Sequence, residues 1–122
     1  MSHPAFDPSA FDTLRSSVSD DAAFLAELVT DYLEDAREHV DTLQQAAADG
    51  QVGQLERTAH SLKSTSQTVG ALALADVCRT IETLAHEGKL DQAAGHVPEV
   101  AARFDAAEVK LRTHQSALEA EC

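Results

Sequence analysis

The chain has 122 residues, of which 43% are hydrophobic, 25% are charged and only 4% are aromatic. Its 21 acidic and 9 basic residues give a formal net charge of −12, which argues against nucleic acids and anionic membranes as partners. No stretch stays apolar for long enough to span a bilayer, and the N-terminus lacks the pattern of a signal peptide. We therefore expect one cytoplasmic, monomeric domain over residues 1–122, with short tails at about 1–7 and 119–122.

The first part of the chain predicts two helices. A short helix is expected at 8–17, with Pro8 near its start, where a missing amide proton costs nothing. Ser19 is a favourable N-cap for a second helix at about 21–49, because its hydroxyl can accept from a free backbone amide. Apolar residues recur in this segment at helical spacing, and Gly50 ends it. Such a pattern is typical of a long helix in a bundle.

The remainder of the chain is also helical by its periodicity. Two helices are predicted at about 52–69 and 71–87, each followed by a turn that contains glycine. The last helical stretch begins near Leu90, is interrupted around Pro98 and continues to Leu118. Short connections between long amphipathic helices favour antiparallel neighbours. The predicted fold is all-α, an antiparallel up-and-down four-helix bundle with a short extra N-terminal helix.

One histidine, His60, is predicted to face solvent in the middle of a bundle helix. At 100° per residue it lies about 130° from the centre of the apolar stripe of the 52–69 helix. Lys63, Ser64 and Gln67 project near it, one or two turns further along. An imidazole nitrogen is a nucleophile, a lysine supplies positive charge, and hydroxyl and amide groups can bond phosphoryl oxygens. The cluster could therefore carry a phosphoryl group, although an exposed histidine on an acidic helix is also common without any function.

Other chemistries find less support in the sequence. A di-iron bundle needs a carboxylate three residues before a histidine, and no histidine here has one at that offset. Neither cysteine has a second metal ligand at a helical spacing that suits zinc. No glycine-rich phosphate loop is present for an autonomous kinase. We therefore expect no metal site.

The segment AHSLKSTSQTVGA, residues 59–71, resembles the signature of histidine-containing phosphotransfer (HPt) domains, in which an H-x-L-K-G-S-S run leads to a glycine and a small residue. Ser64 departs from it, because the family most often has glycine there. The length of the chain and the acidic long helix before the segment are also similar to the family. The matching residues are His60, Leu62, Lys63, Ser66, Gly70 and Ala71.

The resemblance implies a phosphorelay intermediate. His60 would accept a phosphoryl group from the phospho-aspartate of one receiver domain and pass it to the aspartate of another. Such receiver domains belong to hybrid histidine kinases and response regulators. The receiver would bring Mg²⁺, so this chain would need no cofactor and would not be an enzyme in its own right. A non-catalytic adaptor that binds receivers without carrying phosphate is the alternative.

The resemblance and the helical wheel together assign roles around His60. Lys63 is expected to support the phosphoryl oxygens, and Gln67 to hydrogen-bond the imidazole or the phosphate. The expected partner contacts are Ser64, Arg57 and Ser61. Gly70 is expected to be structural, because a left-handed turn suits glycine.

Three nearby side chains are expected to have no part in transfer. Ser66 lies on the apolar stripe, where its hydroxyl is predicted to bond a backbone carbonyl. Glu56 is predicted to be a solvated acid. His86 is predicted to complement the negative end of its helix.

Overall fold

The computed structural model describes residues 3–122 and contains six α-helices and no strand in that part of the chain. The all-α prediction is confirmed, and the interruption expected around Pro98 separates the last two helices. The helices are α1 (Pro8–Ser17), α2 (Ala22–Asp49), α3 (Val52–Val69), α4 (Leu72–His86), α5 (Leu90–Gly95) and α6 (Val97–Ala120).

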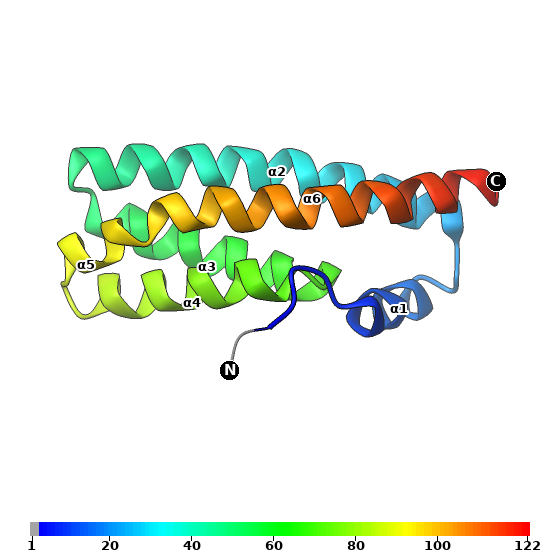
Figure 1. Cartoon of the computed structure of the whole chain (residues 1–122), viewed down its shortest axis with the longest axis horizontal. Helices are drawn as coiled ribbons and strands as arrows, with labels where there is room; N and C mark the ends of the chain where they lie inside the picture. Colours follow the sequence, from blue (N-terminus) through cyan, green and yellow to red (C-terminus); the bar gives the residue numbers. More distant parts are fainter. Residues whose placement is uncertain (1–2) are drawn as a thin grey trace.

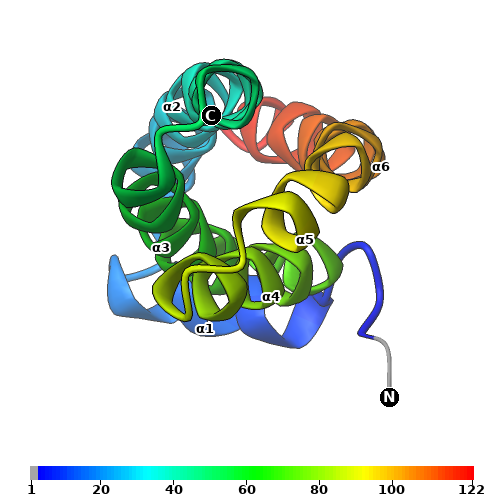
Figure 2. The same ribbon diagram turned by 90° about the vertical axis from the view of Figure 1, so that its left-hand side faces the viewer.

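Four of these helices, α2, α3, α4 and α6, form an up-and-down antiparallel bundle (Figure 1). Seen from the end, they surround one core in the order α2, α3, α4, α6, so that α3 and α6 are diagonal to each other (Figure 2). The short α1 packs against α3, and α5 joins α4 to α6. The predicted bundle with an extra N-terminal helix is confirmed. No helix in residues 3–122 combines the length and the apolar character needed to cross a membrane.

The core is built from aliphatic side chains and alanines, together with the buried aromatic residues Phe6, Phe11, Tyr32 and Phe104. Leucines from α2, α3 and α4 have no exposed surface in it; they include Leu43, Leu62 and Leu74. Each such side chain contributes roughly 1.5–3 kcal/mol on burial, so the bundle helices are held firmly in place. A histidine carried on α3 is therefore mounted on a rigid support.

Tyr32 of α2 and Ser66 of α3 make one hydrogen bond inside this core, at 2.8 Å between their oxygens. The prediction that Ser66 lies on the core side of its helix is confirmed, but the partner expected for its hydroxyl, a backbone carbonyl, is wrong. Burial raises the pKa of the Tyr32 hydroxyl, against a smaller opposing effect of its hydrogen bond with Ser66. The pair satisfies two polar groups that would otherwise be buried without partners.

The helix ends follow the chemistry of capping, with one correction. Asp21, not Ser19, caps α2, and its carboxylate accepts from the amide of Phe24 at 3.0 Å. Ser19 and Asp20 instead form the turn before the helix, both with φ of 58°. Gly50 and Gly70 end α2 and α3 in the left-handed conformation, as predicted, with φ of 69° and 90°.

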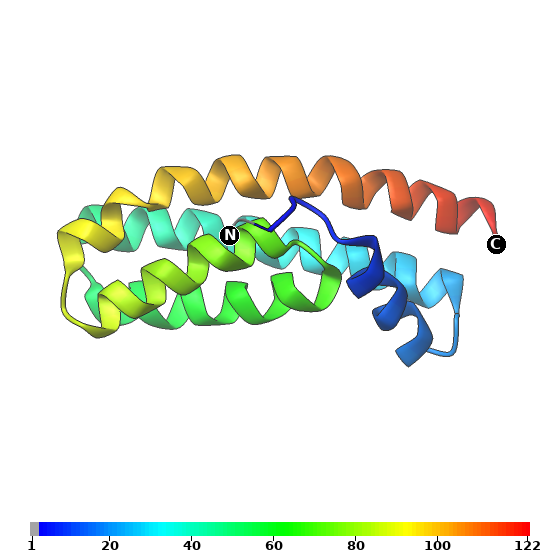
Figure 3. The same cartoon turned by 60° about the horizontal axis from the view of Figure 1, so that its bottom comes forward.

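Residues 4–7 belong to the packed structure and not to the tail expected at 1–7. Figure 3 shows this segment passing beside α4 and α6 on its way to α1. Phe6 is buried, with its ring centroid 4.6 Å from that of His114 on α6. The amide of Asp7 donates to the carbonyl of Gly70 at 2.8 Å, and the amide of Ala73 donates to the carbonyl of Pro4 at 2.9 Å. The segment is thereby fixed to the turn that joins α3 and α4.

The C-terminal residues are also more ordered than the tail predicted at 119–122. Helix α6 continues to Ala120. The next residue, Glu121, accepts two bonds from the guanidinium of Arg15 on α1. These bonds outweigh the effect of desolvation and hold the pKa of the Glu121 carboxyl below its usual value. The pair joins the extra helix to the end of the bundle.

Candidate functional site

His60 stands on the outer surface of α3, close to the middle of the helix. Its neighbours Ala59 and Leu62 are fully buried, and they fix the rotation of the helix about its axis. The His60 side chain is 59% exposed, which confirms the direction predicted from the apolar stripe. An incoming protein can therefore reach the imidazole.

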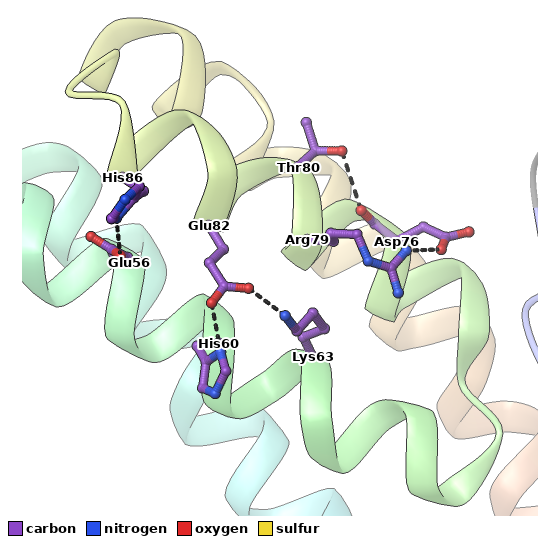
Figure 4. Close-up of polar contacts among 8 residues, drawn as sticks. All are labelled: Glu56, His60, Lys63, Asp76, Arg79, Thr80, Glu82 and His86. Atoms are coloured by element: carbon purple, nitrogen blue, oxygen red, sulfur yellow. Dashed lines mark hydrogen bonds and ion pairs between the residues drawn. The ribbon is translucent and has the colours of Figure 1, made fainter.

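A glutamate from the neighbouring helix, Glu82 of α4, contacts both His60 and Lys63 (Figure 4). One carboxylate oxygen lies 2.5 Å from Nδ1 of His60, and the other lies 2.6 Å from Nζ of Lys63. Lys63 and Glu82 are only about one-fifth exposed, at 20% and 21%. A single carboxylate thus joins the two side chains and ties α3 to α4.

The ionisation of Glu82 determines which imidazole nitrogen is free. Partial burial acts to raise the pKa of the Glu82 carboxyl, but the bonds from Lys63 and His60 together hold it below its usual value. An ionised carboxylate can only accept, so Nδ1 of His60 must carry the proton and donate it. Figure 4 shows the other ring nitrogen, Nε2, pointing away from Glu82. In the neutral ring that nitrogen holds the lone pair.

Comparisons with known proteins identify the family of this chain. The family model for the Hpt domain matches residues 27–119. The chain belongs to the Hpt domain family. Among solved structures, histidine-containing phosphotransfer protein B (HptB) from Pseudomonas aeruginosa PAO1 is similar, with a TM-score of 0.85, 25% identity, and coverage of 95% of this chain and 98% of that one.

A candidate histidine-containing phosphotransfer protein from rice shares the fold of this Hpt domain. Its TM-score is 0.80 at 20% identity, and the match covers 94% of this chain and 82% of the rice chain. Among curated proteins, none is significantly similar in sequence to this chain.

Glu82 of this Hpt domain was not predicted from the sequence, although its position can be deduced from the hairpin. His60 precedes Ala71 by 11 positions and Glu82 follows it by 11, so an antiparallel pair of helices turning at that residue places them side by side. The same rule pairs Glu56 with His86, each 15 positions from Ala71. The missing information was the rotation of α4, which decides whether Glu82 faces α3.

Glu56 and His86 do form a second pair on this face of the domain. Nδ1 of His86 lies 2.9 Å from a Glu56 carboxylate oxygen (Figure 4). Glu56, which was predicted to be a solvated acid, is 35% exposed and is paired with this histidine. His86 is the last residue of α4, as expected, and its side chain is 79% exposed.

The other predicted site residues of the Hpt domain are exposed on α3, and within residues 3–122 none makes a hydrogen bond or an ion pair with the His60 side chain. Arg57, Ser61 and Ser64 all present their side chains to solvent, and the described part of the chain gives Arg57 no ion pair. Gln67 faces a hollow that Ala10 of α1 also lines. No hydrogen bond joins Gln67 to His60 within residues 3–122, because the two residues are about two helical turns, or roughly 10 Å, apart along α3. The role of Gln67 toward a phosphoryl group stays a prediction.

Among residues 3–122, no three histidine, cysteine, aspartate or glutamate side chains are placed to hold a metal ion. Burial raises the pKa of the Cys78 thiol to about 12, and Cys122 is exposed at the C-terminus; both are free thiols.

Proposed function

We propose that this Hpt domain carries a phosphoryl group on Nε2 of His60, between receiver domains of a phosphorelay. The observation that carries the proposal is the exposed imidazole whose inner nitrogen is held by the ionised Glu82. The outer nitrogen is then both accessible and able to act as a nucleophile. The name of the Pseudomonas structure, a histidine-containing phosphotransfer protein, supports the same role.

The transfer step uses few groups of this chain. The Nε2 lone pair attacks the phosphorus of a receiver's aspartyl phosphate, the N–P bond forms, and the P–O bond to the aspartate breaks as its carboxylate leaves. The proton on Nδ1 stays on the ring throughout, so the ring gains positive charge. Glu82 stabilises that charge because its carboxylate already lies against Nδ1. Attack by a second receiver's aspartate on the same phosphorus reverses these changes.

Lys63 is proposed to support the transferred group. In the resting protein its ammonium is bound to Glu82 and not directed to solvent. A phosphoryl group on Nε2 would introduce negative charge nearby, and the flexible lysine stem allows the ammonium to turn towards it. Glu82 is thus a positioning residue for both His60 and Lys63.

The partner supplies the rest of the site. A receiver is expected to bring the aspartate and Mg²⁺, and Arg57, Ser61 and Ser64 are proposed to lie under its docked surface. Since these side chains are exposed on the same helix as His60, none has to move out of the core to reach a partner. We propose no kinase activity for the domain itself.

A phosphotransfer assay with a matched histidine control tests the proposal. The wild-type chain, His60→Gln and His86→Gln are each mixed with a phosphorylated receiver, and acid-labile, base-stable label is followed. We expect the wild type and His86→Gln to be labelled and His60→Gln to remain unlabelled while it still binds the receiver. Label on His60→Gln equal to the wild type would contradict the proposal. Receiver binding with no label on any of the three would favour the adaptor.

A further inference from the structure

Four exposed hydroxyl side chains follow His60 on α3, and they differ in whether they are already bonded. Those of Thr65 and Thr68 donate to backbone carbonyls four residues earlier, at 3.2 and 3.1 Å. Those of Ser61 and Ser64 are exposed and make no hydrogen bond within residues 3–122. The two serines therefore keep a free hydroxyl donor, and the two threonines do not.

Only one of these serines lies on the same side of the helix as the imidazole. Residues four apart on a helix are neighbours, with Cβ atoms about 5–6 Å apart, whereas consecutive residues do not face each other. Ser64 is the fourth residue after His60, and Ser61 is the next one. Helical side chains also lean towards the N-terminus, which directs the Ser64 hydroxyl back towards His60. A group bound to the imidazole is therefore within reach of Ser64 but not of Ser61.

The other polar groups near His60 on α3 are committed or more distant. The ammonium of Lys63 is bonded to Glu82 at 2.6 Å, and its side chain is only 20% exposed. Gln67 lies about two turns, or roughly 10 Å, along the helix. Figure 4 shows Nε2 of His60 pointing away from Glu82, so a group on that nitrogen lies outside the carboxylate contact. Ser64 thus offers a free donor to a group on Nε2 without any existing bond being broken.

We infer, on the basis of the proposed function, that the Ser64 hydroxyl donates a hydrogen bond to a phosphoryl oxygen when His60 is phosphorylated. Phosphoryl oxygens are strong acceptors, and bonds to charged acceptors are roughly twice as strong as those between neutral groups. The glycine that the Hpt family most often has at this position cannot make such a bond. Since the bond favours the dianionic form of the phosphoryl group, it lowers the second pKa of that group.

Phosphorylation without a receiver tests this inference. Phosphoramidate is the donor: the Nε2 lone pair attacks its phosphorus, the N–P bond to the ring forms, and ammonia leaves. The wild type, Ser64→Ala and the matched control Ser61→Ala are treated in this way, and the ³¹P signal of phosphorylated His60 is followed against pH. His60→Gln identifies that signal, because it alone lacks it. Both alanine variants replace an exposed serine within a helix, a change that favours the helix.

We expect the second pKa of the phosphoryl group to be about 0.5 higher in Ser64→Ala than in the wild type, and unchanged in Ser61→Ala. Equal values in the wild type and Ser64→Ala would overturn the inference, as would the same increase in Ser61→Ala.

The labelled wild type is then mixed with an unphosphorylated receiver and Mg²⁺, which separates the inference from the proposed function. If the phosphoryl group passes to the receiver but the Ser64 result fails, the inference alone is wrong. If no phosphoryl group passes, or if His60 takes no label, the proposed function fails and the inference with it.

Discussion

Glu82 binds His60 and Lys63 with different oxygens of one carboxylate, so each bond affects the other. The bond to Nδ1 fixes the imidazole proton on the inner nitrogen and leaves Nε2 free to react. The bond to Nζ holds the lysine close to the imidazole without pointing it into solvent. A carboxylate that is shared in this way can orient the nucleophile before transfer and release the lysine afterwards.

Removal of the Glu82 carboxylate should change the proton distribution on His60. In Glu82→Ala the inner nitrogen loses its acceptor, and we expect a mixture of both neutral tautomers in the ¹⁵N spectrum of the ring. The transfer rate should fall about tenfold, which corresponds to about 1.4 kcal/mol. Glu82→Gln should restore the tautomer, because its amide oxygen can also accept from Nδ1.

The control for this experiment is Glu56→Ala, which removes the equivalent carboxylate from His86 on the same face. It should leave the His60 tautomer and the transfer rate as they are in the wild type. An unaltered His60 spectrum in Glu82→Ala would show that Glu82 does not orient the ring.

Substitution of Lys63 should slow transfer without unfolding the domain. Lys63→Ala removes the positive charge proposed to support the phosphoryl oxygens, and we expect roughly a tenfold loss of rate with a partial recovery in Lys63→Arg. Stopped-flow or quenched transfer assays measure this directly. Lys110→Ala on α6 removes the same charge far from His60, and a comparable loss in that variant would refute a local role for Lys63.

For individual residues, the sequence predicts which side chains are exposed better than it predicts their hydrogen-bond partners. The exposure of His60 and the half-buried position of Lys63 follow from their angles to the apolar stripe. The partnership with Glu82 depends on the rotation of a second helix, which one helix's periodicity cannot give. The hydrogen bond between Tyr32 and Ser66 was missed for the same reason.

Gly70 connects the turn between α3 and α4 to the N-terminal segment. Its φ of 90° is left-handed, and a Cβ there would lie 2.7 Å from the carbonyl oxygen of Asp7. We expect Gly70→Ala to lower the free energy of unfolding by about 2–3 kcal/mol, as measured with urea, because backbone strain adds to that clash.

Gly88 offers a matched control for this turn. Its φ of 76° is also left-handed, but no atom lies within 4 Å of the position of a Cβ. Gly88→Ala should therefore cost only about 1 kcal/mol. An equal decrease in the free energy of unfolding in the two variants would mean that the close approach of the Asp7 carbonyl oxygen to Gly70 does not affect stability.

The contact between α3 and α4 should weaken in acid. The folded-state pKa of Glu82 lies below its ordinary value of 4.5, so its bonds stabilise the fold above that pH and are lost as the pH falls below it. We expect Glu82→Gln to be about 0.5–1 kcal/mol less stable than the wild type at pH 7. The difference in free energy of unfolding between the two proteins, measured with urea, should diminish towards about pH 3. A difference that is the same at about pH 7 and at about pH 3 would contradict this account.

Helices are the elements that the sequence predicts well. Long amphipathic repeats and glycine stops define α2, α3 and α4, because one periodic pattern extends over many residues in each. The cap at Asp21 and the packing of Phe6 against His114 were not predicted. The first depends on the conformation of a turn, and the second on a contact between residues far apart in the chain.

The molecule as a whole is a rigid acidic bundle, and the imidazole proposed to carry the phosphoryl group is exposed near the middle of α3. The bundle supplies rigidity, and the hairpin register supplies Glu82. The fold class could be predicted from composition and periodicity alone. The identity of the nitrogen that we propose to react could not be predicted in this way, because it depends on the contact between His60 of α3 and Glu82 of α4.

Nuclear magnetic resonance of the chain after reaction with a phosphorylated receiver tests that identity most directly. Coupling between phosphorus and ¹⁵N-labelled imidazole nitrogen locates the new bond on a particular ring atom. The predicted result is a single phosphoryl group on Nε2 of His60, with the proton still on Nδ1. A phosphoryl group on Nδ1, or on any side chain other than His60, would contradict the mechanism.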